Sequence, residues 1–411
     1  MTTVSFYKFV NKKSGTTIQK SSNRCLHLQL GLAFLAQLFS ASRAHAEDQL
    51  DYGYEYYKED GNRMTIETHS VYFEQKLTDS VTTKGELVYD GISGSTPTGM
   101  INASTGQPKY TQLQDIRRSG NIEFDCKLGL NTLSPGFAYS KESDYQSIGL
   151  SLNDAMEFNE KNTTLQYGIS HNFDSVRVEQ PNNYTGKTMT LWNDKSSTEV
   201  FIGISQLLSP KTTFNAAFTF GNDSGYLSDP YRLVGILPIN QPPINFVQGY
   251  PENRPSHRNK EVLFTSMTHC YDSLNASLEG SYRLYHDSYG VVANTVGLTW
   301  HQWLGSHFIA EPFFRIYEQS AASFYTYGSR GSVYLTKYGT YAASDYASSD
   351  YRLSEFYSTD MGLLATAVIN AHLHIFAGYH RYEMHGMDGG ATPSAMYPKA
   401  NVYTVGLSIL W

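Results

Sequence analysis

Apolar and polar residues alternate along most of this chain with a period of two, from about residue 50 to the C-terminus. Between residues 308 and 316, Phe308, Ala310 and Phe314 share one face. Glu311 and Arg315 fall on the opposite face. Successive side chains of a strand point to opposite faces, so this period predicts strands with one apolar and one polar face.

Strands of this kind recur about sixteen times, with an uncertainty of two either way, and their connections sort by parity. The even-numbered connections are short polar turns, whereas every long connection is odd-numbered. The strands are predicted to start near residues 50, 64, 80, 113, 131, 144, 161, 196, 211, 260, 273, 290, 307, 349, 370 and 399. The long loops are predicted near 93–112, 176–195, 223–259, 321–348 and 385–398. Short periplasmic turns and long extracellular loops are typical of outer-membrane barrels.

Closure of the sheet follows from the environment that such strands require. In hydrocarbon every backbone N–H and C=O group needs an internal partner, so only helices or closed barrels span a membrane. We therefore predict an all-β fold for residues 47–411, a single closed antiparallel transmembrane β-barrel of about 16 strands (14–18). Clusters of tyrosine near strand ends, such as Tyr52 to Tyr57 and Tyr282 to Tyr289, suit aromatic girdles at the membrane interfaces.

The first 46 residues differ from the rest and predict an export signal. They hold six basic residues and no acidic one, followed by an apolar run over 26–39 and the sequence Ala44-His45-Ala46. This order of charged region, short apolar region and small-residue site predicts a signal peptide cleaved after Ala46. The apolar run is shorter than the roughly 20 residues that a membrane-spanning helix needs.

Composition and charge exclude several classes of protein. The 411 residues include 17% charged residues, 32 Tyr and 3 Cys, with a formal net charge of −7. Cleavage of the signal peptide would leave 25 basic and 38 acidic residues, a net charge of −13. An acidic chain is a poor partner for nucleic acid. Three cysteines do not support a disulfide scaffold, and we expect no cofactor.

The C-terminal residues alternate in the same way and end on an aromatic residue. This pattern resembles the signal by which bacterial barrel-assembly machinery recognises its substrates, although an ordinary last strand would give the same alternation. The residues expected to form the assembly signal are Tyr403, Val405, Leu407, Ile409 and Trp411.

Several motifs resemble an uncharacterised family of Gram-negative outer-membrane β-barrel proteins, catalogued as a domain of unknown function (family 3570). The resemblance covers the whole predicted mature chain and rests on NRMTI (62–66), GELVYDG (85–91), SDPYR (228–232), RPSHRNK (254–260), YHRYEM (379–384) and YPKAN (397–401). It implies an outer-membrane barrel, and it supplies no activity, substrate or catalytic residue.

The polar faces of the strands identify the residues that would line the lumen. A Lys or Arg on the lipid face costs about 2–4 kcal/mol at the bilayer midplane, so charges are expected to point inward. They would either form a ladder of salt bridges that stiffens the wall or line a channel that filters solutes, and the two interpretations are compatible. The residues are Lys84, Glu86, Asp90, Asp115, Arg117, Glu123, Asp125, Glu279, Arg283, Glu311 and Arg315.

The connection at 223–259 is the best candidate for a constriction or plug. Six prolines stiffen it, and basic residues lie near its ends. Long ordered loops are usually functional. The basic ends would meet acidic wall residues, or attract anionic solutes or lipopolysaccharide phosphates. The residues singled out are Asp229, Arg232, Arg254 and Arg258.

Catalytic and metal chemistry find little support in the sequence. His372, His374 and His380 share a strand face, but they lie beside a polar turn. No G-x-S-x-G nucleophile elbow is present, and paired carboxylates such as Glu86 and Asp90 are common in barrel walls. We expect no metal site and no enzyme.

The leading functional hypothesis is a porin-like channel for small polar solutes in the outer membrane of a Gram-negative bacterium. One alternative is a structural barrel that holds an envelope complex, with a lipoprotein or redox protein as partner. A third is an outer-membrane surface enzyme. The other expected partners are membrane lipid, lipopolysaccharide and the barrel-assembly machinery. Sixteen strands are wide enough for an aqueous channel unless loops fill it, and the solute is not defined by the sequence.

Overall fold

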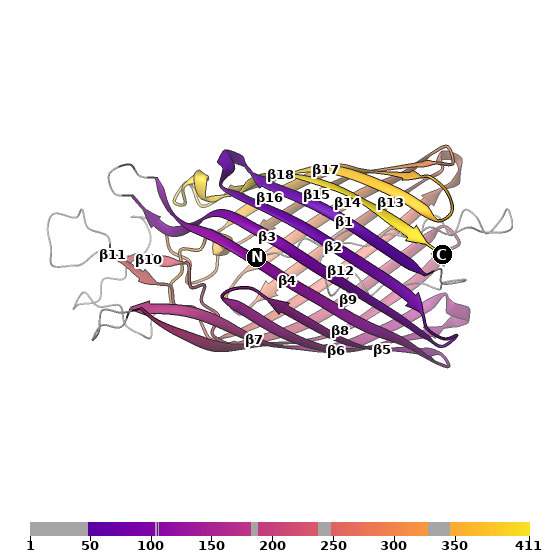
Figure 1. Cartoon of the computed structure of the whole chain (residues 1–411), viewed down its shortest axis with the longest axis horizontal. Coiled ribbons are helices and arrows are strands. Elements are labelled where there is room, and N and C mark those ends of the chain that lie inside the picture. The colour runs from indigo at the N-terminus through magenta and orange to yellow at the C-terminus, as the bar shows by residue number, and fades with distance from the viewer. Residues whose placement is uncertain (1–47, 103–104, 106, 182–187, 237–247, 328–345) are drawn as a thin grey trace.

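The computed structural model describes the chain from residue 48 onward, apart from 103–104, 106, 182–187, 237–247 and 328–345. The predicted signal peptide at 1–46, with Ala44 and Ala46, lies outside the described residues. Sixteen antiparallel strands close into one barrel, and a separate two-stranded sheet lies in a loop (Figure 1). Around the ring, each strand neighbours the one before and after it in the sequence, and β9 neighbours β12.

The number of strands in the barrel agrees with the predicted sixteen. The barrel comprises β1 (Gln49–Glu59), β2 (Met64–Lys76), β3 (Val81–Ile101), β4 (Pro108–Leu128), β5 (Asn131–Lys141), β6 (Tyr145–Phe158), β7 (Thr163–Pro181), β8 (Thr188–Ser209), β9 (Thr212–Gly225), β12 (His257–Tyr271), β13 (Ala276–Asp287), β14 (Val292–Leu304), β15 (Phe308–Gln319), β16 (Phe356–Val368), β17 (Leu373–Gly386) and β18 (Lys399–Leu410). The small sheet pairs β10 (Leu233–Ile236) with β11 (Gln248–Pro251).

Short 3-10 turns are the other regular elements of the described chain. They are η1 (Asp60–Asn62), η2 (Asn159–Lys161), η3 (Asp272–Leu274), η5 (Tyr351–Leu353) and η6 (Ser394–Met396). Among the described residues, no helix has the length and apolar character needed to cross a membrane.

The distribution of polarity is inside out compared with a soluble protein. Leu87 and Tyr89 on β3 are exposed, whereas Lys84 and Asp90 on the same strand are buried. The same alternation runs around the ring, with Leu150, Ile202 and Leu363 among many exposed apolar residues. Apolar side chains therefore face outward, where hydrocarbon would surround them, and polar side chains face the lumen.

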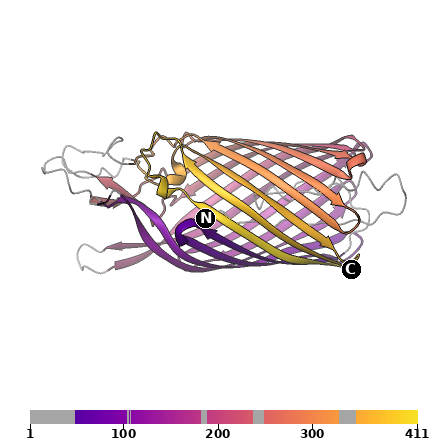
Figure 2. The same ribbon diagram turned by 90° about the horizontal axis from the view of Figure 1, so that it is seen from above.

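The two ends of the barrel differ as the parity of the connections predicts. Figures 1 and 2 show the long connections and the β10–β11 sheet at one end, and the short turns and the C-terminus at the other. At the short-turn end, Gly129 and Gly305 adopt φ values of +68° and +67°. Residues other than glycine or asparagine adopt this left-handed backbone conformation only at a cost in free energy, which explains why glycine occupies these two positions.

Several predicted boundaries are wrong because strands extend beyond the alternating segments. The loop predicted at 93–112 is largely strand, since Thr96 pairs with Thr111 and Ser93 with Gln114. The loop predicted at 176–195 is likewise mostly β7 and β8. Beyond the membrane both faces of a strand meet water, so the alternation disappears although the backbone pairing continues. The strands expected to start near 113, 196 and 349 begin at Pro108, Thr188 and Phe356.

Tyrosines occupy both faces of the wall and do not all belong to a girdle. Tyr52 and Tyr282 are exposed outward, in agreement with the expectation. Tyr285 lies on the inward face beside Arg283, and Tyr289 is buried between loops. A single step along a strand reverses the face, so clustering in sequence does not place tyrosines on one side.

Candidate functional site

The wall formed by β3 and β4 carries paired charges that face the lumen. Lys84 forms a salt bridge with Asp125 across the two strands. Arg117 Nη2 lies 2.5 Å from Asp90 Oδ2. Asp90 also accepts a hydrogen bond of 2.6 Å from Thr68 on β2. These contacts link three neighbouring strands, as expected of a ladder that stiffens the wall.

The other predicted residues of this wall also lie on inward-facing positions. Glu123 accepts a hydrogen bond of 3.4 Å from Asn153 on β6, and Glu86 lies on the inward face of β3. Asp115 lies on β4 towards the long-loop end, where it accepts hydrogen bonds from the backbone and hydroxyl of Ser143.

The opposite wall, from β13 to β16, carries the remaining predicted residues. Glu311 Oε1 on β15 lies 2.7 Å from His301 Nδ1 on β14, at hydrogen-bond distance. Glu279 and Arg283 lie on the inward face of β13, and Arg315 lies on that of β15. Among the described residues, neither arginine forms an ion pair.

Several lumen charges were missed by the sequence analysis, although their strands were identified. Lys260 Nζ on β12 lies 3.0 Å from both Glu199 and Asp223. On another part of the wall, Asp360 contacts His380 Nδ1 at 2.7 Å. Alternation along β8, β9 and β16 places these side chains inward, so the parity rule applied to every strand would have identified them.

Three connections meet across the long-loop end of the barrel, and we call their described residues the cap. The cap comprises 226–236 with 248–256, 320–327 with 346–355, and 387–398. The first connection leaves β9 and returns to β12, yet Arg232 donates a hydrogen bond of 3.1 Å to Thr96 on β3. Five strands lie between β9 and β3 around the ring. The connection therefore crosses the mouth of the barrel.

Asp350 is the centre of an ion network within the cap, and its side chain is 1% exposed. Both of its carboxylate oxygens lie 2.9 Å from Arg352 Nε. Arg254 Nη2 lies 2.8 Å from Oδ2, and Arg232 Nε lies 3.5 Å from Oδ1. The network thus joins two connections that are about a hundred residues apart in sequence, and one carboxylate organises three guanidiniums.

Two further carboxylates complete the network. Asp229 contacts Arg352 and lies 3.9 Å from Arg232. Glu252 lies 2.6 Å from Arg254 Nε and accepts a hydrogen bond from Ser348. Of the residues predicted for the constriction, the structure therefore brings together Asp229, Arg232 and Arg254. Their partners at 346–355 carried no signal in the sequence.

Ionisation of this network depends on the balance between burial and ion pairing. Burial alone would raise the pKa of Asp350, but Arg352, Arg232 and Arg254 hold this pKa well below its ordinary value of 3.8. Burial also opposes, without overcoming, the effect of Arg352 and Arg232, which lower the pKa of Asp229. Burial raises the pKa of Glu252 although Arg254 opposes the shift.

These shifts determine how the cap responds to acid. A lowered pKa contributes stability that is present above the unfolded value and lost as the pH falls through the folded value. The contributions of Asp350 and Asp229 are therefore complete at neutral pH and lost only below about pH 3.8. Glu252 has a raised pKa, so its contribution to the stability of the cap increases as the pH falls.

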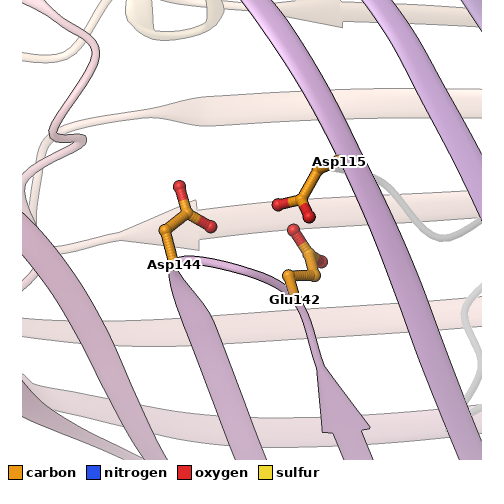
Figure 3. A group of neighbouring side chains, drawn as sticks. All are labelled: Asp115, Glu142 and Asp144. Atoms are coloured by element: carbon orange, nitrogen blue, oxygen red, sulfur yellow. The ribbon is translucent and has the colours of Figure 1, made fainter.

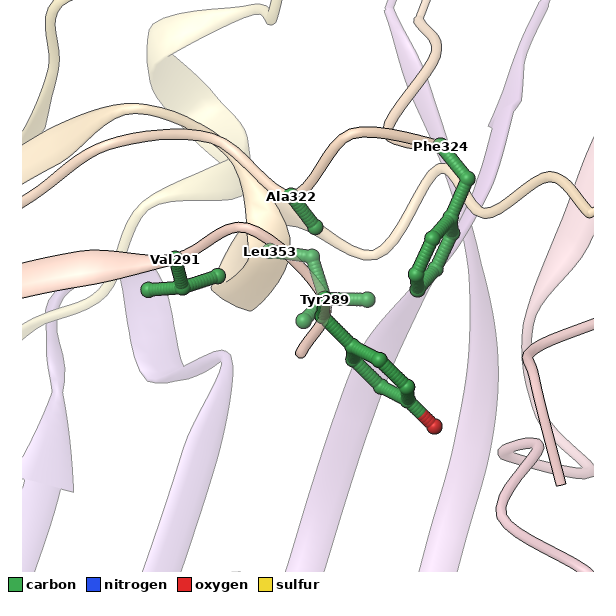
Figure 4. Packing of buried hydrophobic residues seen from close by; sticks show 5 residues of the cluster. All are labelled: Tyr289, Val291, Ala322, Phe324 and Leu353. Atoms are coloured by element: carbon green, nitrogen blue, oxygen red, sulfur yellow. The ribbon is translucent and has the colours of Figure 1, made fainter. Parts of the chain in front are cut away.

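Apolar packing and hydrogen bonds attach the cap to the barrel rim. Tyr289 and Val291, between β13 and β14, pack against Ala322, Phe324 and Leu353 (Figure 4). A second cluster joins Phe356, Met384 and Tyr397. At another point of the rim, the Tyr231 hydroxyl donates a hydrogen bond to Asp144 in the β5–β6 turn. The cap is thus held at several separate strands.

Arg258 does not belong with the cap residues, which corrects its assignment to the constriction. Its Nε donates a hydrogen bond of 2.8 Å to Asp287 on β13. The strand β12 begins at His257, so Arg258 is part of the wall. The pairing agrees with the expectation that the basic ends of this connection meet acidic wall residues.

A group of carboxylates near the rim was not anticipated. Asp115, Glu142 and Asp144 each offer an oxygen within 4.8 Å of the others (Figure 3). Burial raises the pKa of Glu142; Arg117 opposes this shift, and Asp144 and Asp115 reinforce it. Oxygen donors of this kind suit Ca²⁺ or Mg²⁺. In this structure, Asp144 binds Tyr231 and Asp115 binds Ser143, so both have protein partners.

The closed ring, its apolar outer surface and its charged lumen define a transmembrane β-barrel of the outer-membrane type. The chain belongs to the family described as "Protein of unknown function (DUF3570)", whose model matches residues 32–411. No curated protein matches the sequence.

Several solved outer-membrane proteins are similar in structure. A bacterial polysaccharide outer membrane secretin has a TM-score of 0.45 at 10% identity, covering 90% of this chain and 100% of that chain. CdiB from Acinetobacter baumannii has a TM-score of 0.48 at 7% identity, covering 89% and 61%. The siderophore receptor PirA from Pseudomonas aeruginosa has a TM-score of 0.40 at 9% identity, covering 90% and 64%.

Proposed function

We propose that this protein is a porin-like channel that passes small polar solutes through the outer membrane. The observation that supports the proposal is the charged inner wall of a closed sixteen-strand barrel. A soluble barrel would bury apolar side chains, and a small barrel would fill its lumen with them. We further propose that the chain is exported by a signal peptide cleaved after Ala46.

Electrostatics would favour cations over anions in this channel. Carboxylates outnumber lysines and arginines on the inward-facing positions of the wall, and a lumen of one sign concentrates ions of the opposite sign. The carboxylates include those of Asp51, Glu55, Glu59, Glu74, Glu86, Asp90, Asp115, Glu123, Asp125, Asp174, Glu199, Asp223, Glu279, Asp287, Glu311 and Asp360. The basic residues are Lys84, Arg117, Lys195, Arg258, Lys260, Arg283 and Arg315, with Lys76, Lys109 and Lys127 at strand ends on the same alternation.

Conductance in a planar lipid bilayer tests the proposal. The protein would be expressed from its full sequence and extracted from membranes in detergent. We expect stable current steps that increase in proportion to salt concentration, and a reversal potential of the sign for cation preference under a salt gradient. A second arm uses Asp350→Asn, which removes the carboxylate at the centre of the cap network.

The two arms separate the possible outcomes. Steps from the wild-type protein support an open channel, whereas steps from the variant alone support a channel that the cap closes. Absence of steps from both proteins, when both migrate as folded barrels, would show that the channel hypothesis is wrong.

A scaffold barrel is the second candidate, and the cap is the observation that favours it. Because the cap crosses the mouth and is bound to β3 and to the β5–β6 turn, a closed barrel would be better suited to holding a partner than to passing solutes. Chemical cross-linking in intact cells tests this candidate. A specific envelope lipoprotein or redox protein bound to a non-conducting barrel would support it.

A further inference from the structure

Two lumen arginines differ from the other basic residues on the barrel wall. Lys84, Arg117 and Lys260 each contact a wall carboxylate at salt-bridge distance. Among the residues that the structure describes, Arg283 and Arg315 have no such partner. The Nε atom of Arg283 is buried without a hydrogen-bond partner in the same set of residues; so is that of Arg117, but Arg117 has Asp90 within salt-bridge distance of its Nη2. A buried N–H group that lacks an acceptor is costly, unless a ligand supplies one.

Stacking on tyrosine holds both guanidiniums in place. The guanidinium carbon of Arg283 lies 5.3 Å from the ring centroid of Tyr285, and that of Arg315 lies 5.9 Å from the ring centroid of Tyr317. Both distances fall within the range of about 6 Å for cation–π contact. A stacked guanidinium keeps the N–H groups of its edge available for a planar acceptor.

The register of the strands directs both arginines towards one part of the lumen. Arg283 lies opposite Thr295 on β14, and Arg315 lies opposite Gly297 on the same strand. The two arginines therefore flank β14, and their Cα atoms are about 12 Å apart by strand spacing and rise. Gly297 presents no side chain between them. Two long side chains that flank this position can reach the same small anion.

The neighbouring carboxylates are already occupied by other residues. Asp360 lies directly across from Arg315 in the β15–β16 pair, but it contacts His380 at 2.7 Å. Glu199 lies near Arg283 and contacts Lys260 at 3.0 Å. The two arginines carry the same charge and flank the same strand. Like charges without a carboxylate between them form a site for a counter-ion.

We propose that Arg283 and Arg315 bind the oxyanion group, phosphate or carboxylate, of a solute inside the lumen. Each guanidinium would donate paired N–H groups to the oxygens, a geometry that suits both anions. Because the surrounding lumen is acidic and repels anions, binding of an anion would depend on these two residues. The inference deepens the proposed channel function, because it places a selective binding site in a lumen that otherwise favours cations.

Isothermal titration of the detergent-purified full-length product tests the site, with inorganic phosphate and with citrate as separate probes. We expect saturable binding by the wild-type protein, and the probe that binds more tightly identifies the preferred group. Arg283→Gln and Arg315→Gln should each weaken binding by about tenfold or more, because each removes a charge-assisted hydrogen bond. Arg315→Lys should bind with intermediate affinity, since it keeps the charge but loses the planar fork.

Arg118→Gln is the matched control, because Arg118 stacks on Tyr89 at 5.9 Å on the outward face. It makes the same change of net charge and should leave binding unchanged. All variants must migrate as folded barrels. Absence of saturable wild-type binding, or an equal loss in the Arg118→Gln variant, would overturn the proposed site. Conductance without binding overturns the site alone, and binding without conductance by either the wild-type protein or the Asp350→Asn variant overturns the channel alone.

Discussion

At the residue scale, Asp350 explains why two distant connections meet in a defined arrangement. Burying the carboxylate and the guanidiniums of Arg232 and Arg254 costs desolvation free energy, so such a network is weak evidence of stability. The network instead specifies one arrangement of the two connections. Hydrogen bonds of 2.8–2.9 Å to the carboxylate oxygens of Asp350 define the positions of Arg254 and Arg352. Apolar residues would hold the connections together without specifying one arrangement.

Replacing the central carboxylate should loosen the cap. In Asp350→Asn the three arginines lose their shared counter-charge, and breaking a buried ion pair by removing one partner costs about 3–5 kcal/mol. We expect trypsin to cleave after Arg232 and Arg352 faster in the variant, because both bonds lie in a cap that opens more often. Fragment analysis by mass spectrometry would measure the rates.

The matched control is Asp79→Asn, which breaks the exposed pair with Lys76 in the β2–β3 turn. Exposed pairs contribute little to stability, so its rate of cleavage in the cap should equal that of the wild-type protein. Equal rates in the Asp350→Asn variant would contradict the role assigned to the network.

At the scale of the elements, β3 extends beyond the rim and provides the surface on which the cap rests. Gly99 on this strand adopts a φ of +92°. A Cβ atom there would lie 1.9 Å from Ser349 Oγ and 2.6 Å from the carbonyl oxygen of Leu233. Two cap connections therefore approach the β3 backbone at a single position that has no side chain.

Gly99→Ala should separate the cap from β3. The added methyl group meets a backbone carbonyl that cannot move without the β10 strand, and overpacking of this kind costs about 1–3 kcal/mol. We expect faster amide hydrogen exchange in 346–355 and in β10, measured by mass spectrometry. Gly91→Ala on the same strand is the control, because its nearest contact would be 4.0 Å away. No difference between the two variants would show that the close approach does not hold the cap.

At the scale of the whole molecule, pairing of the first and last strands closes the barrel. β1 pairs with β18 from Gln49 opposite Leu410 to Glu59 opposite Ala400. The backbone groups of Asp48 and Trp411 extend this pairing with hydrogen bonds of 2.9 and 3.0 Å. Closure leaves no sheet edge within the membrane, which satisfies every backbone group of the spanning strands.

Deletion of Trp411 should reduce assembly in the outer membrane. Trp411 is 56% exposed, so loss of its side chain removes little packing in the folded barrel. The deletion also removes the two backbone hydrogen bonds with Asp48, so Trp411→Ala, which keeps them, tests recognition during assembly by itself and should reduce assembly too. The amount of protein in outer membranes that migrates faster unboiled than boiled measures assembly. Trp192→Ala, which removes another exposed tryptophan, should leave this amount unchanged. Normal assembly after the deletion would contradict the assembly-signal hypothesis.

The sequence by itself determined the barrel and which side chains face its lumen. Alternation is a local property, so Lys84, Arg117 and Glu311 were assigned to the inward face without knowledge of their partners. It failed beyond the membrane, where both faces of a strand meet water and the pattern disappears, so the loops at 93–112 and 176–195 were predicted too long.

Only the tertiary structure decided which of these residues meet. Arg254 and Asp350 are 96 residues apart and belong to different connections, and no local pattern relates two segments that cross the mouth from different strands. The isolation of Arg283 and Arg315 depends in the same way on the register of β13 to β17, which places Asp360 in contact with His380. Strand identity is encoded residue by residue, whereas charge pairing depends on how the closed ring aligns its strands and brings its loops together.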